Sequence, residues 1–290
     1  MKNTMKKTVA LVLAVLMAAA VFSLTACDAK PGTTDDTQES GEAVAPGIQK
    51  IKDAGKLVLY TEAGFPPYEF IYNNELVGVD IEIVKAIAAE IGVELDIQDV
   101  NFDTIVGAIV SGKADIGAAG ITIRDDRKES VDFTVPYSST EQCVIVAAGQ
   151  KIPKVEDLKG KKIGVQQGTT SDFLVEGLIN DGTLEGCEQT AYNTPALAAA
   201  AIGKIDAVVT DKLTSQIIVS GSNGSLISEA LLYADGSPVT DVEEYGIAIS
   251  KDNKDLLEVA NKVLNKLLDE GKVDAWTEEY NALAKTVDGE

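Results

Sequence analysis

The stretch Ala118-Ala119-Gly120-Ile121-Thr122-Ile123-Arg124-Asp125-Asp126-Arg127 joins an apolar segment to a charged one. The mainly apolar run from Ala114 to Ala119 stops at Gly120, and a hydroxyl residue and a charge cluster ending at Arg127 follow it. This order is typical of a buried strand that delivers polar groups to a cleft. Backbone groups after Gly120, the Thr122 hydroxyl and a guanidinium could together bind an ammonium and a carboxylate on one carbon. The stretch therefore predicts a site for an α-amino acid.

The same charges have a simpler interpretation. Taken alone, a run such as Arg124-Asp125-Asp126-Arg127-Lys128-Glu129 is more often a solvated face than a clamp for a ligand. The choice between a binding site and a charged surface depends on what the remaining segments place beside this run.

The N-terminal residues predict export from the cytoplasm. Lys2, Lys6 and Lys7 precede an apolar run from Val9 to Leu24, which is the pattern of a secretory signal over residues 1–26. The residues Leu24-Thr25-Ala26-Cys27 match the bacterial lipobox, in which the signal is cut before the Cys and that Cys is lipidated. The alternative is a plain signal peptide with an incidental Cys. Residues 28–46 are mostly polar or small, with almost no large apolar residue, so we expect a lipidated Cys27 followed by a flexible tether over residues 27–46.

Composition excludes several function classes. The formal net charge is −21, and removing the signal lysines makes the exported chain more acidic, which excludes nucleic acid as a partner. The chain has no His, which excludes an imidazole base and a His metal site. Cys143 and Cys187 lack the spacing of a metal or redox motif; they could pair with each other or remain buried free thiols.

Residues 56–123 predict a parallel βαβ arrangement. A strand at Lys56–Tyr60 runs into a loop fixed by Pro66 and Pro67, and a helix follows with Asp80 as its expected N-cap. A second strand, a second helix from about residue 103 and a third strand complete the pattern. Ligands bind at the carboxyl ends of such strands, where the loop after Tyr60 and the opening stretch meet. Phe102 lies in a loop at the same edge, although it could equally pack into the core.

The pattern begins again after Tyr137. A strand at Lys162–Val165 is followed by Gly168-Thr169-Thr170 and a helix, whose free N–H groups and dipole suit a carboxylate. Thr169 or its neighbours would also cap that helix. The segment Gly203-Lys204-Ile205-Asp206 before the next strand repeats Gly112-Lys113-Ala114-Asp115, and Asp211 ends that strand. These repeats predict two similarly built lobes, with lobe 1 formed by 47–140 and 233–290 and lobe 2 by 141–232. The connections would lie near 138–143 and 231–238.

Five motifs together carry a resemblance to a known family. They are the loop Thr61–Glu69, Leu76-Val77-Gly78-Val79-Asp80, the segment Gly120–Arg127, Gln167-Gly168-Thr169-Thr170 and Glu244-Tyr245-Gly246. From about Gly47 to Leu283 the chain resembles the amino-acid-binding proteins of bacterial ABC importers, the solute-binding proteins of family 3. The resemblance implies the α/β fold of type II periplasmic binding proteins, which has two lobes, a hinge of two strands and a ligand cleft between the lobes.

The resemblance also implies roles for the residues that would hold the amino-acid group. Arg127 corresponds to the Arg that pairs with the ligand α-carboxylate, assisted by the backbone N–H groups of Thr122 and Thr170. The α-ammonium would be held by the Gly120 carbonyl, the Thr122 hydroxyl and the Asp211 carboxylate.

Other positions would contact the ligand side chain. Phe65 and Phe102 correspond to aromatic walls, and Glu62 stands where several relatives have an Asp facing the distal end of the ligand. A carboxylate there would accept hydrogen bonds from a guanidinium, ammonium or amide and would repel an acidic side chain. Relatives often have Ser at positions 119 and 120, and Arg124 is unusual beside the motif. These departures affect the selectivity for the ligand side chain and not the binding of the amino-acid group.

The function implied is that of a monomeric, lipid-anchored receptor outside the cytoplasm. It would bind a polar L-amino acid, a cationic one slightly preferred, and deliver it to a permease of the ABC type without chemistry, cofactor or metal. The alternatives are a secreted enzyme on the same fold, such as a dehydratase, and the ligand-binding component of a sensor. Recovery of unmodified amino acid after release would distinguish the receptor from the enzyme.

Overall fold

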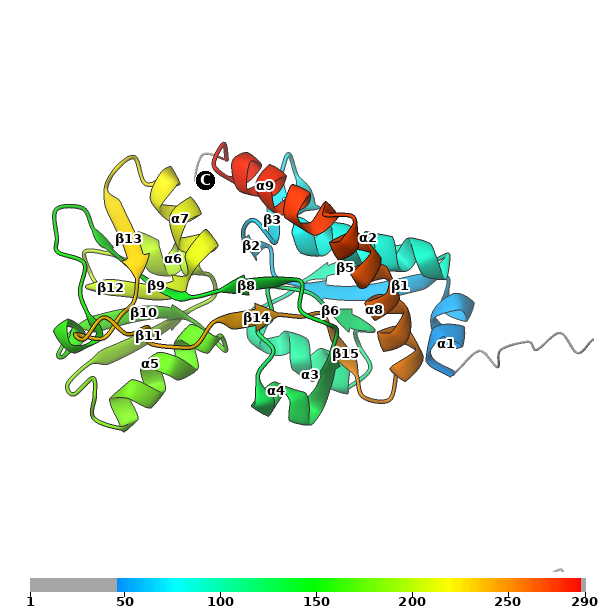
Figure 1. Cartoon of the computed structure of the whole chain (residues 1–290), viewed down its shortest axis with the longest axis horizontal. Helices are drawn as coiled ribbons and strands as arrows, with labels where there is room; N and C mark the ends of the chain where they lie inside the picture. Colours follow the sequence, from blue (N-terminus) through cyan, green and yellow to red (C-terminus); the bar gives the residue numbers. More distant parts are fainter. Residues whose placement is uncertain (1–45, 288–290) are drawn as a thin grey trace, which may run out of the picture. The chain divides into compact units, whose positions relative to one another are not determined.

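The computed structural model describes residues 46–287. The predicted signal peptide, the lipidation of Cys27 and the tether before Pro46 lie outside the described residues. Within them, two five-stranded sheets are each covered by helices and are joined by a pair of crossing strands (Figure 1). The predicted α/β architecture of two similar lobes is confirmed.

The first sheet positions the loops named from the sequence. Its spatial order is β5 (Glu94–Asp99), β1 (Lys56–Thr61), β6 (Ile116–Gly117), β15 (Ala248–Ser250), β7 (Val131–Phe133). The strands β5, β1 and β6 are parallel, and β15 runs antiparallel to both of its neighbours. Leu57 and Leu59, on one face of β1, are fully buried, and Val58 and Tyr60, on the other face, are partly buried, as expected for a strand covered on both faces. Because β1 and β6 are parallel neighbours, the loops after Thr61 and Gly117 leave the sheet at the same edge.

Helices cover both faces of this sheet. One core joins it to α1 (Pro46–Ala54), α2 (Val79–Ile91), α8 (Lys254–Asp269) and α9 (Lys272–Ala284), and another joins it to α3 (Ile105–Val110). The short helices η1 (Phe102–Thr104) and α4 (Asp125–Ser130) flank α3. The predicted N-cap of α2 is wrong, because Gly78 occupies the cap and Asp80 is fully buried in the first turn. A three-stranded hairpin sheet precedes α2: β2 (Gly64–Phe65), β3 (Glu69–Tyr72), β4 (Glu75–Val77).

The second sheet repeats the arrangement of the first. Its spatial order is β11 (Glu188–Tyr192), β10 (Lys162–Gln166), β12 (Ala207–Asp211), β9 (Gln142–Ala147), β13 (Leu226–Ala230). Again three parallel strands are followed by one antiparallel strand, β9. One core contains residues of α5 (Thr170–Asn180) and η2 (Val155–Leu158), and another contains residues of α6 (Pro195–Ala200) and α7 (Lys212–Gly221).

Two strands connect the lobes. β8 (Ser138–Thr140) pairs antiparallel with β14 (Glu243–Tyr245), and Figure 1 shows both running between the two sheets. The first connection lies where the sequence predicts it. The second comes later than predicted, because Leu231 is buried in the core of the second sheet and Val239 packs against that core. The stretch 231–239 therefore stays with lobe 2, and the chain returns to lobe 1 at β14.

A small apolar cluster spans the lobes away from the hinge. Phe70 of β3 and Ala284 of α9, both on lobe 1, are buried together with Ile217 of α7 on lobe 2. Figure 1 shows the end of α9 beside α7. The lobes are thus in contact through an apolar cluster as well as through the polar groups described below.

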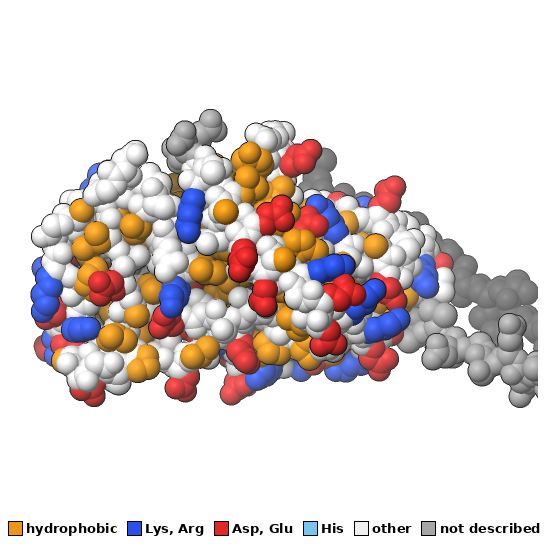
Figure 2. Space-filling view, turned by 45° about the horizontal axis from the view of Figure 1, so that its top comes forward, with side chains coloured by type: hydrophobic (Ala, Val, Ile, Leu, Met, Phe, Trp, Pro, Cys, Tyr) orange, Lys and Arg blue, Asp and Glu red, His pale blue; other side chains and the backbone are white. Residues whose placement is uncertain are grey.

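The surface carries charges of both signs. On the face drawn in Figure 2, acidic and basic side chains are interspersed over the half that holds the first sheet. Ion pairs such as Lys262–Glu90 and Lys56–Asp96 are solvent-exposed, so each contributes little to stability. Among the helices of residues 46–287, none has the length and apolar character needed to cross a bilayer.

Candidate functional site

A pocket lies between the lobes where the carboxyl ends of β1, β6, β10 and β12 converge. The cavity itself is small, about 10 Å³, so the lobes lie close together around it. Of the residues predicted from the sequence, those on its wall are Phe65, Phe102, Gly120, Thr122, Arg127, Thr169, Thr170 and Asp211. Residues on the wall that the sequence did not single out for binding are Ala119, Gln166, Ser171 and Thr210. Glu62 is the one predicted residue that is absent from the wall.

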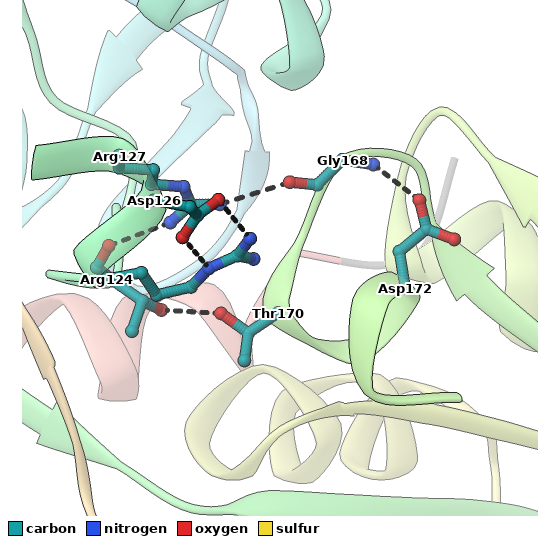
Figure 3. A network of polar contacts seen from close by, with 7 residues as sticks. Arg124, Asp126, Arg127, Gly168, Thr170 and Asp172 are labelled. Carbon is teal, nitrogen blue, oxygen red and sulfur yellow. Dashed lines mark hydrogen bonds and ion pairs between the residues drawn. The ribbon is translucent and has the colours of Figure 1, made fainter. Parts of the chain in front are cut away.

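Arg127 connects the two lobes at one end of the pocket. Its side chain is buried, with a residue exposure of 7%, and donates hydrogen bonds to the carbonyl oxygens of Thr122 at 2.9 Å and Gly168 at 3.1 Å (Figure 3). The guanidinium carbon lies 5.3 Å from the centre of the Phe102 ring. Burial lowers the pKa of Arg127 to about 10, and the nearby charge of Arg124 adds to this effect. The side chain therefore stays cationic at neutral pH, which suits a carboxylate partner.

The start of α5 faces this guanidinium from lobe 2. The Thr169 hydroxyl accepts a hydrogen bond from the Asp172 N–H at 3.3 Å, which caps the helix as the sequence predicts. The Thr170 hydroxyl lies 3.1 Å from that of Thr122 on lobe 1 (Figure 3). Gly168, with φ +76°, brings the backbone so close to lobe 1 that a Cβ there would lie 2.8 Å from that of Asp103. The helix N-terminus and Arg127 thus offer positive potential at the same end of the pocket.

Two carboxyl groups lie on or beside the same wall. Asp211 accepts hydrogen bonds from the Gln142 amide at 2.6 Å and from the Tyr245 hydroxyl at 2.5 Å. The same Gln142 amide donates to Glu243 at 3.1 Å, and Glu243 also accepts from the Thr122 hydroxyl at 3.3 Å. Burial, followed by the charge of Glu243, raises the pKa of Asp211 to about 7. The pKa of Glu243 is likewise raised by burial. A cation bound in the pocket would favour the charged form of both carboxyls.

Three residues around Asp211 were not predicted from the sequence. Gln142 begins β9, directly after the connecting strand β8, and Glu243 and Tyr245 belong to the connecting strand β14. A signal was present for one of them, since Glu244-Tyr245-Gly246 is among the family motifs, but its side-chain partners depend on the pairing of β14 with β8.

Glu62 lies behind the wall and not on it. Its carboxylate accepts a hydrogen bond at 3.0 Å from the Gln166 amide, which itself faces the pocket. Glu62 is 6% exposed, and burial raises its pKa to about 7. Any influence of Glu62 on a bound molecule therefore acts through Gln166 in this arrangement.

Aromatic side chains hold the Gly120 turn from lobe 1. The Phe65 ring stacks on Tyr68 with 5.8 Å between centroids and meets Tyr245 edge-on at 6.3 Å. Gly120 has φ +54°, and a Cβ at that position would lie 2.6 Å from the Phe65 ring. Only glycine fits this close approach, which explains why the polar stretch begins with it.

Arg124 differs from Arg127 although both belong to the same charge cluster. It forms a bidentate pair with Asp126 at 2.9 and 2.6 Å (Figure 3), and its guanidinium lies 4.3 Å from the centre of the Phe173 ring. Arg124 is not part of the pocket wall. The Arg124 side chain is only 17% exposed, so the solvated-face interpretation describes Asp125 and Asp126, whereas Arg124 pairs beside the pocket and Arg127 turns into it.

Within residues 46–287, no group of three or more His, Cys, Asp or Glu side chains is arranged to hold a metal ion. Cys143 and Cys187 are both free thiols, and the Cys187 thiol donates to the Leu158 carbonyl at 2.9 Å. Of the two possibilities left open by the sequence, the structure has the unpaired one.

Comparisons with known proteins agree with this architecture. Residues 57–282 match the family described as bacterial extracellular solute-binding proteins, family 3. The L-cystine-binding protein of Escherichia coli strain K12 is 27% identical, over 80% of this chain and 85% of the relative. The arginine-binding extracellular protein of Bacillus subtilis is also 27% identical, over 90% of this chain and 94% of the relative.

Solved structures show the same fold. A mutant of ArgBP from T. maritima superposes with a TM-score of 0.73 and 34% identity, covering 81% of this chain and 99% of that one. An amino acid ABC transporter substrate-binding protein from Streptococcus pneumoniae, solved bound to L-arginine, has a TM-score of 0.74 and 28% identity, covering 81% and 98% of the two chains.

Proposed function

Because the chain belongs to the bacterial extracellular solute-binding proteins of family 3, we propose that it is an extracytoplasmic receptor for a polar L-α-amino acid. The receptor delivers its ligand to an ABC-type permease, and its relatives by name bind solutes. We propose that this chain likewise binds without chemical change. Recovery of the unmodified amino acid from the denatured complex tests that point, and a converted product would contradict it.

The observation that carries the proposal is the presence of opposite charges on the wall of one pocket. The buried guanidinium of Arg127 lies on this wall together with the start of α5 and the Asp211 carboxyl, and Glu243 shares the Gln142 amide with Asp211. An α-amino acid presents a carboxylate and an ammonium on one carbon, so its backbone group matches this pair of charges. Arg127 would take the carboxylate, and Asp211 with the Gly120 carbonyl would take the ammonium.

We further propose that a cationic side chain is preferred. The pocket and the groups directly behind it contain three carboxyls, Asp211, Glu243 and Glu62, against the single guanidinium of Arg127. Burial raises the pKa values of these carboxyls, and a positive group bound beside them would favour their charged forms. Arginine or lysine would supply a second positive group, whereas glutamate would add to the repulsion. Arginine-bound relatives support this choice.

Calorimetric titration with arginine, lysine, histidine, glutamine, cystine, glutamate and leucine tests the proposal. We expect arginine or lysine to bind with a Kd in the micromolar range or below, which corresponds to a binding free energy of about −8 kcal/mol or a more negative value. If glutamate or leucine binds most tightly, the proposed cationic preference is wrong, but the proposed receptor function stands. If no amino acid binds, the proposed receptor function is wrong.

Attachment to the membrane rests on residues outside the described part. We propose that Cys27 carries the lipid predicted from the lipobox. The variant Cys27→Ser should then leave the membrane fraction, and a variant that remains there with the parent would contradict the anchor.

A further inference from the structure

A pair of carboxyl groups beneath the pocket has no place in the proposed binding scheme. Glu69 of β3 and Asp80 of α2 are both fully buried. Within the described residues, neither forms an ion pair with a Lys or Arg. Both oxygens of Glu69, one oxygen of Asp80 and the hydroxyl of Tyr137 are buried atoms without a hydrogen-bond partner among those residues. Such a set is costly unless a proton joins its members.

The remaining oxygen of Asp80 reaches the binding site. Asp80 Oδ2 accepts a hydrogen bond from the Gly120 N–H at 2.9 Å, and this contact is buried. Phe65 closes over the other side of Gly120, where a Cβ would lie 2.6 Å from the ring. Asp80 and Phe65 therefore fix the orientation of the peptide whose carbonyl, in the proposed function, receives the ligand ammonium.

The groups around the pair are acids and phenols. The charges that act on Glu69 are those of Asp80, Glu62 and Asp99, and Tyr68 and Tyr137 lie beside them. Burial, followed by the charge of Asp80, raises the pKa of Glu69 well above its ordinary value. Burial raises the pKa of Asp80 only to about 6, because the Gly120 N–H stabilises its anion. Two adjacent carboxyls in such a site cannot both ionise.

We propose that Glu69 keeps its proton at neutral pH and donates it to Asp80, whose single negative charge then holds the Gly120 N–H. Asp80 and Glu69 are positioning residues that aim the Gly120 carbonyl into the pocket. The proton belongs on Glu69 because only Asp80 has a donor for its anion. A hydrogen bond to a carboxylate is about twice as strong as one to a neutral acceptor, so the arrangement gives Gly120 a firmer hold than a neutral pair would.

Amide variants test where the proton lies. Glu69→Gln replaces the protonated acid by a group of the same shape that still donates, whereas Asp80→Asn removes the charge that holds Gly120. We expect arginine affinity to fall less than about threefold in Glu69→Gln and about tenfold or more in Asp80→Asn. Glu75→Gln, at the exposed first residue of β4 in the same hairpin, is the matched control and should bind as the parent does.

Infrared spectroscopy of the ligand-free protein gives a readout that a purely structural role would not change. At about pH 8.5, where carboxyls with a pKa near 7 have ionised, we expect one protonated carboxyl band in the parent and in Glu75→Gln, and none in Glu69→Gln. A parent without the band, or a Glu69→Gln variant that keeps it, would overturn the proposal. Tolerance of Asp80→Asn together with a large loss in Glu69→Gln would put the proton on Asp80 instead.

This inference rests on the proposed function only for the ammonium contact. If the parent binds no amino acid, the receptor proposal fails, while the infrared band still decides whether Glu69 holds a proton. If Asp80→Asn does not fold, the comparison of the parent with the two Gln variants decides in the same way.

Discussion

The Arg127 guanidinium has more N–H donors than its contacts with the protein use. A guanidinium carries five N–H donors, and within residues 46–287 it donates two hydrogen bonds, to the carbonyls of Thr122 and Gly168. Those bonds fix the plane of the group from both lobes, and the remaining donors are free to pair with a carboxylate. The fixed geometry means that a ligand does not have to order this side chain on binding.

Replacing Arg127 should show whether its side chain contacts the ligand directly or only contributes a positive charge nearby. Removing one partner of a desolvated charge pair costs roughly 2–5 kcal/mol, so Arg127→Ala should weaken arginine binding by at least about thirtyfold. Arg124→Ala removes the same charge three positions away but outside the pocket, and should change affinity less than about threefold. Calorimetry on both variants measures the difference. Equal effects would mean that Arg127 makes no direct contact with the ligand.

Asp211 should release a proton when a ligand ammonium binds. Its pKa of about 7 in the free protein means that it is partly protonated at neutral pH. A cation beside it favours the charged form, so affinity should rise as pH increases through about 7 and then level off. Titrations at pH 7 in buffers of different ionisation enthalpy should show proton release, and Asp211→Asn should show less. Equal release by parent and variant would assign the proton to another group.

The site residues that could be predicted from the sequence are those whose positions follow from their neighbours along the chain. Arg127, Thr122 and Thr170 follow strand ends or begin a helix, and parallel strands bring such positions to one edge. Gln142 and Glu243 could not be identified in this way, because their shared contact requires β8 and β14 to pair across a hundred residues of chain. Which way the Glu62 side chain points from its loop is likewise a tertiary property.

Among the helices and strands, the sequence pattern predicts most elements correctly, but it misplaces the second connection between the lobes. The turn-rich residues 234–238 suggested a crossing from one lobe to the other. They form a local turn of lobe 2, since Leu232 and Pro238 bridge to each other and Leu231 is buried there. Turn chemistry predicts that a chain reverses, but the partner it reverses onto is set by packing.

The loop before α5 should report on contact between the lobes. Gly168→Ala adds a Cβ that would lie 2.8 Å from Asp103 of lobe 1, in addition to the strain of φ +76°. Gly182→Ala has a similar φ of +84° with nothing within 4 Å, so it is a matched control for strain. Both should lose about 1–2 kcal/mol of unfolding free energy. Only Gly168→Ala should also weaken arginine binding, by about tenfold. A similar loss of affinity in Gly182→Ala would show that strain, and not the contact, is responsible.

At the scale of the whole molecule, the family predicted from the sequence is confirmed, and its buried acids set the pH response. Burial raises the pKa values of Glu62 and Asp211 to about 7 and that of Asp80 to about 6. A raised pKa gives stability that is complete below the unfolded pKa near 4 and is lost as pH rises through the folded value. Exposed carboxylates with lowered pKa values, such as Asp132 and Glu90, act only in the more acidic range.

The ligand-free protein should therefore be more stable at pH 5 than at pH 7. We expect the unfolding free energy to fall by roughly 1 kcal/mol per pH unit for each of these carboxyls across this window, until its folded pKa is reached. Urea denaturation in moderate salt, which screens repulsion within the acidic chain, measures it. Asp211→Asn should show a shallower slope. A stability that rises from pH 5 to pH 7 would mean that these carboxyls ionise in the folded state as they do in the unfolded one.

The sequence of lobe 2 interrupts that of lobe 1, and this affects the order in which the protein folds. All five strands of the second sheet come from residues 142–230, whereas β15, at residues 248–250, must enter the first sheet between β6 and β7. The first lobe stays incomplete until a chain segment of more than a hundred residues has been closed, and closing long loops slows folding. Pulse-labelling hydrogen exchange during refolding should therefore show amides of β10 and β12 protected before those of β6 and β15. The reverse order would mean that β15 finds its place before the inserted lobe has formed.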